Sequence, residues 1–182
     1  MLRTFLAATL DPGFLAEAGA LLARLRDRDG IDARWVGLET MHVTLRFFGD
    51  TEEARVPAMI EAVKALGQGR AAPPVRAAKL EGYPELRRAR VVVIDLEDPS
   101  GVLGEMARLG ERAAVAAGFP PEARPWTAHL TLGRSRRVPI DLRHAARRPF
   151  EPWWGHATSV TLYSSETARE GAKHTPLVTV PF

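Results

Sequence analysis

The same four-residue pattern occurs twice in this chain, separated by nearly half of its length. H-V-T-L occupies residues 42–45 and H-L-T-L occupies residues 129–132, and both lie where alternating apolar and β-branched residues predict a strand. One copy of such a pattern arises easily by chance, whereas two copies in the same local context indicate a duplication. We therefore predict a single domain over residues 1–182 that is built of two pseudo-symmetric lobes.

The order of the predicted elements favours antiparallel pairing. Strands are predicted at residues 3–10, 41–48, 75–80, 90–96, 128–132, 158–163 and 177–180. Helices are predicted after Asp11-Pro12, from about Pro57 and over residues 100–117, and the basic residues 134–148 are expected to form a surface loop with at most one helical turn. Because strands outnumber helices and the two do not alternate regularly, we predict an α+β fold rather than a doubly wound parallel sheet.

The composition is that of an ordinary soluble globular protein. Apolar residues make up 46% of the chain and charged residues 26%, and no segment has the roughly 18 to 20 consecutive apolar residues of a membrane span. The absence of cysteine excludes disulfides, thiolate metal sites and thiol catalysis. The apolar run at the N-terminus is too short for a secretory signal, so we expect a cytoplasmic protein. We also expect a monomer with no protein partner.

The charge of the chain leaves its partner open. The formal net charge is +3, and the only lysines are Lys64, Lys79 and Lys173, so nearly all basic residues are arginines. The planar fork of arginine suits phosphate and can stack on bases, which fits an RNA substrate. A GC-rich genome would also produce an arginine-rich chain, and charge alone therefore does not decide between these interpretations.

The two motifs present the side chains that a phosphodiester displacement needs. Successive side chains of a strand point to opposite faces, so His42 and Thr44 share one face, as do His129 and Thr131. Two such strands that face each other would bring two imidazoles and two hydroxyls together. One histidine can then take a proton from water while the other donates to the leaving oxygen, because an imidazole pKa near 6.5 populates both forms. A lone histidine on a strand is more simply interpreted as a structural residue. The occurrence of the same histidine and threonine in two motifs instead favours a catalytic role.

Neighbouring residues extend this hypothesis. On regular alternation Arg46 shares the face of His42 and Thr44, whereas Arg134 joins the face of the second motif only if the strand has a bulge or turn at Gly133. Either arginine can contact phosphate, or simply be solvated. Alternation puts Phe47 on the core face. Trp126, close before the second motif, is either a platform for a base or part of the core.

Other chemistries find little support. A catalytic metal needs three or four histidine or carboxylate ligands, and the remaining histidines, His144, His156 and His174, have neither H-E-x-x-H nor H-x-H spacing. The chain also has no phosphate-binding G-x-x-x-x-G-K-[ST] loop and no G-x-G-x-x-G motif. We therefore expect neither a metal nor a cofactor.

The two motifs resemble those of the two-histidine (2H) phosphoesterase superfamily, and more narrowly those of the bacterial and archaeal RNA 2′,3′-cyclic phosphodiesterases, first described as 2′-5′ RNA ligases (LigT or ThpR). The resemblance covers nearly the whole chain. It rests on the two motif blocks and on three flanking segments, at residues 3–7, 38–49, 128–134, 162–171 and 174–177.

The resemblance implies a bilobal α+β fold in which antiparallel sheets line a central cleft and helices lie outside. It implies hydrolysis of RNA 2′,3′-cyclic phosphate ends to 2′-phosphates, with weak ATP-independent 2′-5′ joining of RNA. It also implies that His42 is the proton donor and His129 the proton acceptor, that Thr44 and Thr131 bind phosphate, and that Arg134 contacts substrate.

The chain departs from the family pattern at two positions. Ala128 precedes the second histidine where the family usually has proline, and His174 stands where a tyrosine is common. Two other functions stay open: another 2H activity, on ADP-ribose cyclic phosphate or 2′-5′ oligoadenylate, and an RNA-binding module without catalysis. Retention of both histidines and both threonines argues against the second, because binding alone needs no acid–base pair.

Overall fold

The computed structural model describes residues 1–168 and 171–182 and has the predicted α+β architecture. Its strands are β1 (Leu2–Leu10), β2 (Ala33–Trp35), β3 (Val43–Thr51), β4 (Pro74–Tyr83), β5 (Val91–Glu97), β6 (His129–Ser135), β7 (Trp154–Ala168) and β8 (Gly171–Pro181). Its α-helices are α1 (Pro12–Asp27), α2 (Val56–Gly67), α3 (Val102–Ala116) and α4 (Arg143–Ala146), and short 3-10 turns lie at Leu38–Thr40, Glu53–Arg55 and Leu86–Arg88. None of the helices described is both long and apolar enough to cross a membrane.

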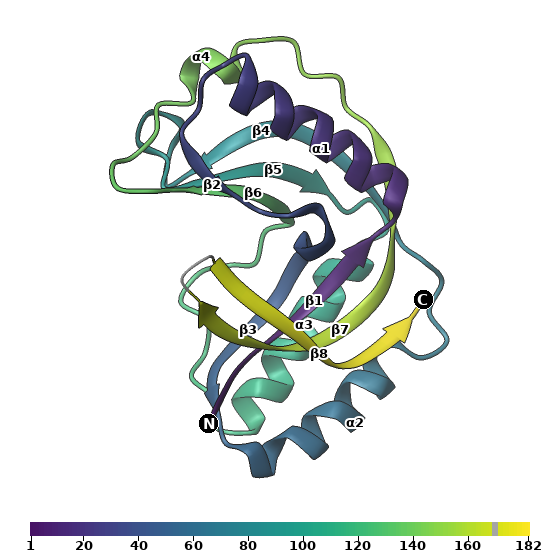
Figure 1. Ribbon diagram of the computed structural model, residues 1–182. Helices are drawn as coiled ribbons and strands as arrows, with labels where there is room; N and C mark the ends of the chain where they lie inside the picture. Colours follow the sequence, from purple (N-terminus) through teal and green to yellow (C-terminus); the bar gives the residue numbers. More distant parts are fainter. Residues whose placement is uncertain (169–170) are drawn as a thin grey trace.

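The strands form two halves that are joined through β7. The strand order is β2-β6-β5-β4-β7-β1-β3, β8 pairs with the other side of β7, and the paired strands run antiparallel. The start of β7 pairs with β4, whereas its later part lies between β1 and β8. Figure 1 shows the two halves curving toward each other, with β2 and β6 in one and β3, β1 and β8 in the other.

The helices lie on the outside of the two halves, as the resemblance implies. Helices α2 and α3 pack against β8 and β3, while α1 and α4 lie over the half that contains β4 and β5 (Figure 1). Helix α1 thus follows β1 in the chain but covers the half that contains β4 and β5. Helix α3 follows β5 in the chain but covers the half that contains β1 and β3. Each half therefore depends on a helix that the opposite half contributes.

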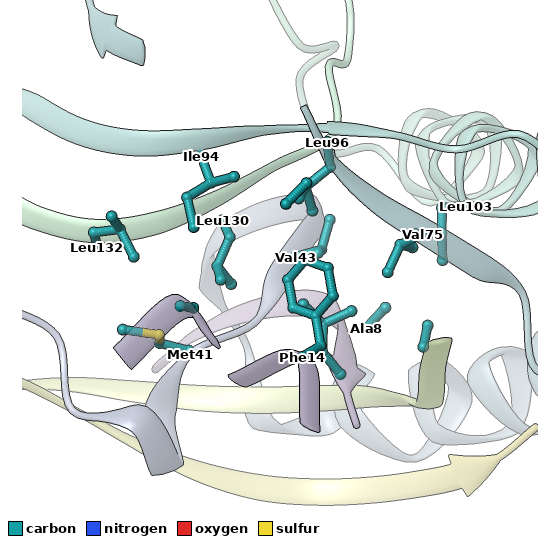
Figure 2. Close-up of a cluster of buried hydrophobic side chains, with 14 of the residues drawn as sticks. Ala8, Phe14, Met41, Val43, Val75, Ile94, Leu96, Leu103, Leu130 and Leu132 are labelled. Carbon is teal, nitrogen blue, oxygen red and sulfur yellow. The ribbon is translucent and has the colours of Figure 1, made fainter. Parts of the chain in front are cut away.

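A continuous apolar core supports the motif strands. Val43 and Leu45 of the first motif and Leu130 and Leu132 of the second are buried, which confirms that each motif turns an apolar side inward. Burial of each such side chain stabilises the fold by about 1.5–3 kcal/mol. Figure 2 shows part of this cluster, in which the labelled residues are Ala8, Phe14, Met41, Val43, Val75, Ile94, Leu96, Leu103, Leu130 and Leu132.

Helix α1 begins as the sequence predicts. The Asp11 carboxylate accepts a hydrogen bond of 2.9 Å from the backbone N–H of Phe14, and Pro12 occupies the first helical position. The other oxygen of Asp11 accepts from the backbone N–H of His156 at 2.6 Å. One side chain therefore caps the helix and also ties it to β7.

Strand β2 was not predicted from the sequence, and the C-terminal strands β7 and β8 are longer than predicted. Strand β2 is three residues long and carries no alternation of its own, because it is held as a strand by pairing of Ala33, Arg34 and Trp35 with β6. Strands β7 and β8 pair with each other well beyond the predicted segments 158–163 and 177–180. The basic stretch contains the single helical turn α4, as predicted, but its first residues extend β6.

Candidate active site

The two motifs meet at a cavity between the halves of the sheet. The cavity has a volume of about 620 Å³, and its lining includes His42, Thr44, Thr131 and Arg134. His129 is not among the lining residues of this cavity. Its neighbour Thr131 lines it, whereas the ring of His129 lies 5.3 Å from that of Tyr83, which lines a second hollow together with Thr127 and Ala128. The structure therefore brings the predicted histidines and threonines, together with Arg134, into one region.

The two imidazoles are held in the same way. The Nδ1 atom of His42 lies 2.7 Å from the carbonyl oxygen of Thr40, and the Nδ1 atom of His129 lies 2.9 Å from that of Thr127. A carbonyl oxygen only accepts hydrogen bonds, so Nδ1 carries the proton in both rings. The other ring nitrogen, Nε2, is then an acceptor when the ring is neutral and a donor when it is charged. Each histidine is thereby prepared to move a proton at Nε2.

Each motif strand contains a β-bulge at the leucine of its H-x-T-L sequence. In the β1–β3 ladder Leu6 pairs with Arg46 and Ala7 pairs with Thr44, so Leu45 is the extra residue. In the β5–β6 ladder Val92 pairs with Gly133 and Val93 with Thr131, so Leu132 is the extra residue. A bulge shifts the alternation by one position, and the residue five places after the histidine returns to the cavity face.

The second bulge gives Arg134 the position that the sequence made conditional on a distortion. Thr131 pairs with Val93 and Arg134 pairs with Val91, and because Val91 and Val93 share a face of β5, Thr131 and Arg134 share a face of β6. The extra residue is Leu132 rather than Gly133, but the consequence is the one anticipated. Arg134 lines the cavity beside Thr131.

The first bulge contradicts the predicted position of Arg46. Its side chain is 5% exposed and points away from the cavity, toward α3 and the segment that follows it. It forms ion pairs with Glu111 at 2.5 Å and Glu122 at 2.8 Å, and donates a hydrogen bond of 2.6 Å to the carbonyl oxygen of Pro120. The prediction that Arg46 shares the face of His42 and Thr44 was wrong because Leu45 breaks the alternation.

The same bulge also reverses the prediction for Phe47. This ring was assigned to the core by alternation, but it is 54% exposed and lines the cavity. Phe47 stands five residues after His42, as Arg134 stands five residues after His129, and both face the cleft. The matching bulges thus put an aromatic ring and a guanidinium at corresponding positions of the two motifs.

Trp126 serves the structure of the first motif. Its Nε1–H donates a hydrogen bond of 2.9 Å to the carbonyl oxygen of Thr44, and the ring packs against the core. Conversely, Val36 precedes the first motif, and its backbone N–H donates a hydrogen bond of 2.9 Å to the carbonyl oxygen of Leu132 in the second motif. The segment before each motif therefore binds the strand of the other motif, which holds the two strands in a defined relation.

Burial controls the charge of His42. Desolvation lowers its pKa to about 4; the Thr40 hydrogen bond opposes this effect, and the positive charges of His174, His129 and Arg134 add to it. His42 is consequently neutral near pH 7 in the unliganded protein. The three basic residues that act on it come from β6 and β8, so both halves of the sheet influence the pKa of His42.

His174 is a member of the site that sequence spacing did not reveal. Its ring lies 5.5 Å from that of His42, in an edge-to-face arrangement, and 4.9 Å from that of Phe5. Burial lowers the pKa of His174, and its Nδ1 atom is buried with no hydrogen-bond partner among the described residues. The only sequence signal was its place in a C-terminal block that resembles the family, at a position where tyrosine is common.

Solved structures with this architecture define a class of protein. A protein of Thermus thermophilus superposes with a TM-score of 0.80 at 22% identity, covering 99% of this chain and 97% of that chain. E. coli LigT, in its complex with 3′-AMP, superposes with a TM-score of 0.72 at 25% identity, covering 100% and 98%. The fold is that of the LigT-like phosphoesterases.

Sequence comparison agrees with this class. The LigT-like phosphoesterase family model matches residues 10–93. The RNA 2′,3′-cyclic phosphodiesterase of Methanothermobacter thermautotrophicus is 30% identical over 132 residues, which are 72% of this chain and 70% of the relative. The enzyme of the same name from Escherichia coli K12 is 29% identical over 144 residues, 79% and 77% of the two chains. This chain belongs to the LigT-like phosphoesterase family.

Proposed function

We propose that this protein hydrolyses the 2′,3′-cyclic phosphodiester at RNA ends to a 2′-phosphomonoester, without a metal or cofactor. The names of its relatives support this substrate, and so does the binding of 3′-AMP by LigT. The observation that carries the proposal is the pair of imidazoles, His42 and His129, each anchored through Nδ1 and each accompanied by a threonine at the cleft.

The reaction requires one proton to be removed and one to be supplied. In the proposed mechanism, Nε2 of His129 accepts a proton from the attacking water as its oxygen bonds to phosphorus. The bond from phosphorus to the ribose 3′ oxygen breaks, and Nε2 of His42 donates a proton to that oxygen. General acid and general base catalysis each contribute typically ~10²–10⁴-fold.

The charge of the substrate reconciles this role of His42 with its low pKa. Burial holds the pKa of His42 at about 4 in the unliganded protein, so the ring carries no proton to donate near pH 7. The cyclic phosphate brings a negative charge next to the ring, which favours the protonated form and raises the pKa. Protonation of His42 is thereby coupled to substrate binding.

The remaining groups of the site bind the phosphate. The hydroxyls of Thr44 and Thr131 and the guanidinium of Arg134 line the cavity and can donate to the non-bridging oxygens. Arg46 has no part in this set, because its guanidinium is bound by carboxylates outside the cavity.

The paired features of the motifs also support the proposal that the domain consists of two lobes derived by duplication. Both motifs anchor the histidine to the carbonyl two residues earlier, and both have a bulge at the leucine. These agreements concern backbone geometry as well as residue type.

The test is hydrolysis of cytidine 2′,3′-cyclic phosphate, and of an RNA dinucleotide that ends in a 2′,3′-cyclic phosphate, in excess EDTA. We expect the wild-type protein to form the 2′-phosphate and both His42→Ala and His129→Ala to lose activity. His144→Ala, at an exposed position of helix α4, is the matched control. Full activity of either site variant contradicts the mechanism, and loss of activity on chelation contradicts its independence from metal.

The roles of the two histidines need a separate measurement. An aryl phosphodiester such as thymidine 4-nitrophenyl phosphate has a leaving group that departs without a proton. If His42 is the donor, His42→Ala keeps much more of its activity on this substrate than on the cyclic one, while His129→Ala loses activity on both. The opposite result reverses the assignment.

A further inference from the structure

Three arginines from separate parts of the chain converge on the cavity. Arg3 comes from β1, Arg34 from β2 and Arg134 from β6, and each has an exposed side chain. The β1–β7 ladder runs without a register shift from Arg3 to Thr9, so Arg3 shares a face with Phe5, which lines the cavity. The arginines therefore lie on both walls of the cleft, Arg3 on one and the other two on the opposite wall.

Arg34 and Arg134 face each other directly. They are partners in the β2–β6 ladder, where cross-strand side chains lie on the same face with Cβ atoms about 4.5–5.5 Å apart. Like charges in such a pair destabilise a sheet. An anion in the cleft removes this repulsion, and the pairing therefore points to a negatively charged ligand.

Acidic residues do not neutralise this group within the part of the chain described. None of the three guanidiniums forms an ion pair there, whereas Arg46, Arg76 and Arg143 are paired with carboxylates. Among the described residues that line the cavity, the only carboxylate is that of Glu39. The cleft therefore has more positive charge than a single phosphodiester, which carries one negative charge, can balance.

The reacting phosphate accounts for only part of this charge. Thr44, Thr131 and Arg134 are assigned to it above, and they lie with His42 and His129 at the meeting point of the motifs. Arg34 is on the edge strand of one half, and Arg3 is two residues from Phe5 toward the start of β1. Both are left without a role in hydrolysis of a mononucleotide.

We propose that Arg3 and Arg34 form a second phosphate subsite, which binds the phosphodiester linking the terminal nucleotide to the rest of the RNA. This inference rests on the proposed function and deepens it, because it names the residues that would recognise the RNA chain beyond its terminal nucleotide. The arginines hold the chain from both walls of the cleft, and so direct its end toward His42 and His129.

The experiment compares kcat/KM for cytidine 2′,3′-cyclic phosphate with kcat/KM for a dinucleotide that ends in the same group. We expect the wild-type protein to prefer the dinucleotide by about tenfold or more, the size of one charge-assisted hydrogen bond. Arg3→Gln and Arg34→Gln each reduce this preference, the double variant abolishes it, and all three keep the wild-type activity on the mononucleotide. Arg108→Gln, which removes an exposed charge from α3, leaves the preference unchanged.

A second substrate tests the charge without altering the protein. In a dinucleotide whose internal linkage is an uncharged methylphosphonate, the wild-type protein should lose its preference and treat the substrate as a mononucleotide. Equal kcat/KM for the charged dinucleotide and the mononucleotide, or an equal loss on both in the arginine variants, would overturn the subsite. A wild-type protein that hydrolyses none of these substrates refutes the proposed function instead, so the two failures are distinguishable.

Discussion

Acidification is expected to weaken the fold through His42. Burial holds the pKa of this histidine at about 4 in the folded protein, against 6.5 for an unperturbed histidine. Between these values the unfolded chain binds a proton that the folded protein does not, so stability falls as the pH drops from 6.5 to 4 and the effect levels off below. A difference of one in pKa corresponds to about 1.36 kcal/mol, which makes the full contribution about 3 kcal/mol.

The measurement is the free energy of unfolding by urea at several pH values, for the wild-type protein and His42→Asn. The asparagine amide can still donate to the Thr40 carbonyl but does not titrate. We expect the wild-type protein to lose about 3 kcal/mol more than this variant between pH 6.5 and pH 4. His144→Asn controls for the substitution itself. If the wild-type and His42→Asn curves run parallel through this range, the argument from burial is refuted.

Three further predictions follow from the geometry of the motif strands. Arg46→Met leaves the partly exposed carboxylates of Glu111 and Glu122 without their partner and should cost about 2 kcal/mol in urea unfolding, with the activity per folded molecule retained. Lost activity at unchanged stability would contradict the position of Arg46 outside the cavity. A Cβ on Gly133 would lie 2.9 Å from Cε3 of Trp35 and 3.1 Å from the carbonyl oxygen of Arg34, so Gly133→Ala should displace β2 and lower kcat/KM. Gly104→Ala is the control and should be tolerated, because the nearest atom to its Cβ would lie at 3.5 Å. Trp126→Phe removes the hydrogen bond to Thr44 and should cost about 1 kcal/mol of stability and lower kcat; a variant with wild-type values on both measures shows that the bond does not position the strand.

Local sequence patterns predicted the elements whose periodicity is strong. The spacing of Phe14, Ala18 and Leu25 defines the buried face of α1, and Asp11-Pro12 defines its start. The motif strands were predicted from β-branched and apolar residues, and their leucines are buried as expected. These features depend on neighbouring residues along the chain, and for that reason they are readable from the sequence.

Positions beyond each motif were predictable only in part. Alternation assigned Arg46 to the cavity and Phe47 to the core, and the structure reverses both. Arg134 was anticipated only on the condition of a bulge. A bulge is a property of a ladder, because it exists only where one strand has an extra residue relative to its partner. The sequence of a single strand does not report the register of its neighbour.

The sequence by itself determined that two H-x-T-L strands exist, that each puts a histidine and a threonine on one face, and that the chain resembles the 2H phosphoesterases. Tertiary structure decided which other side chains join them. Packing of β8 brings His174 against His42, pairing with β6 recruits β2 and Arg34, and burial lowers the pKa of His42. The physical reason is that register, burial and contact across the cleft depend on segments far apart in the chain, which only the folded protein brings together.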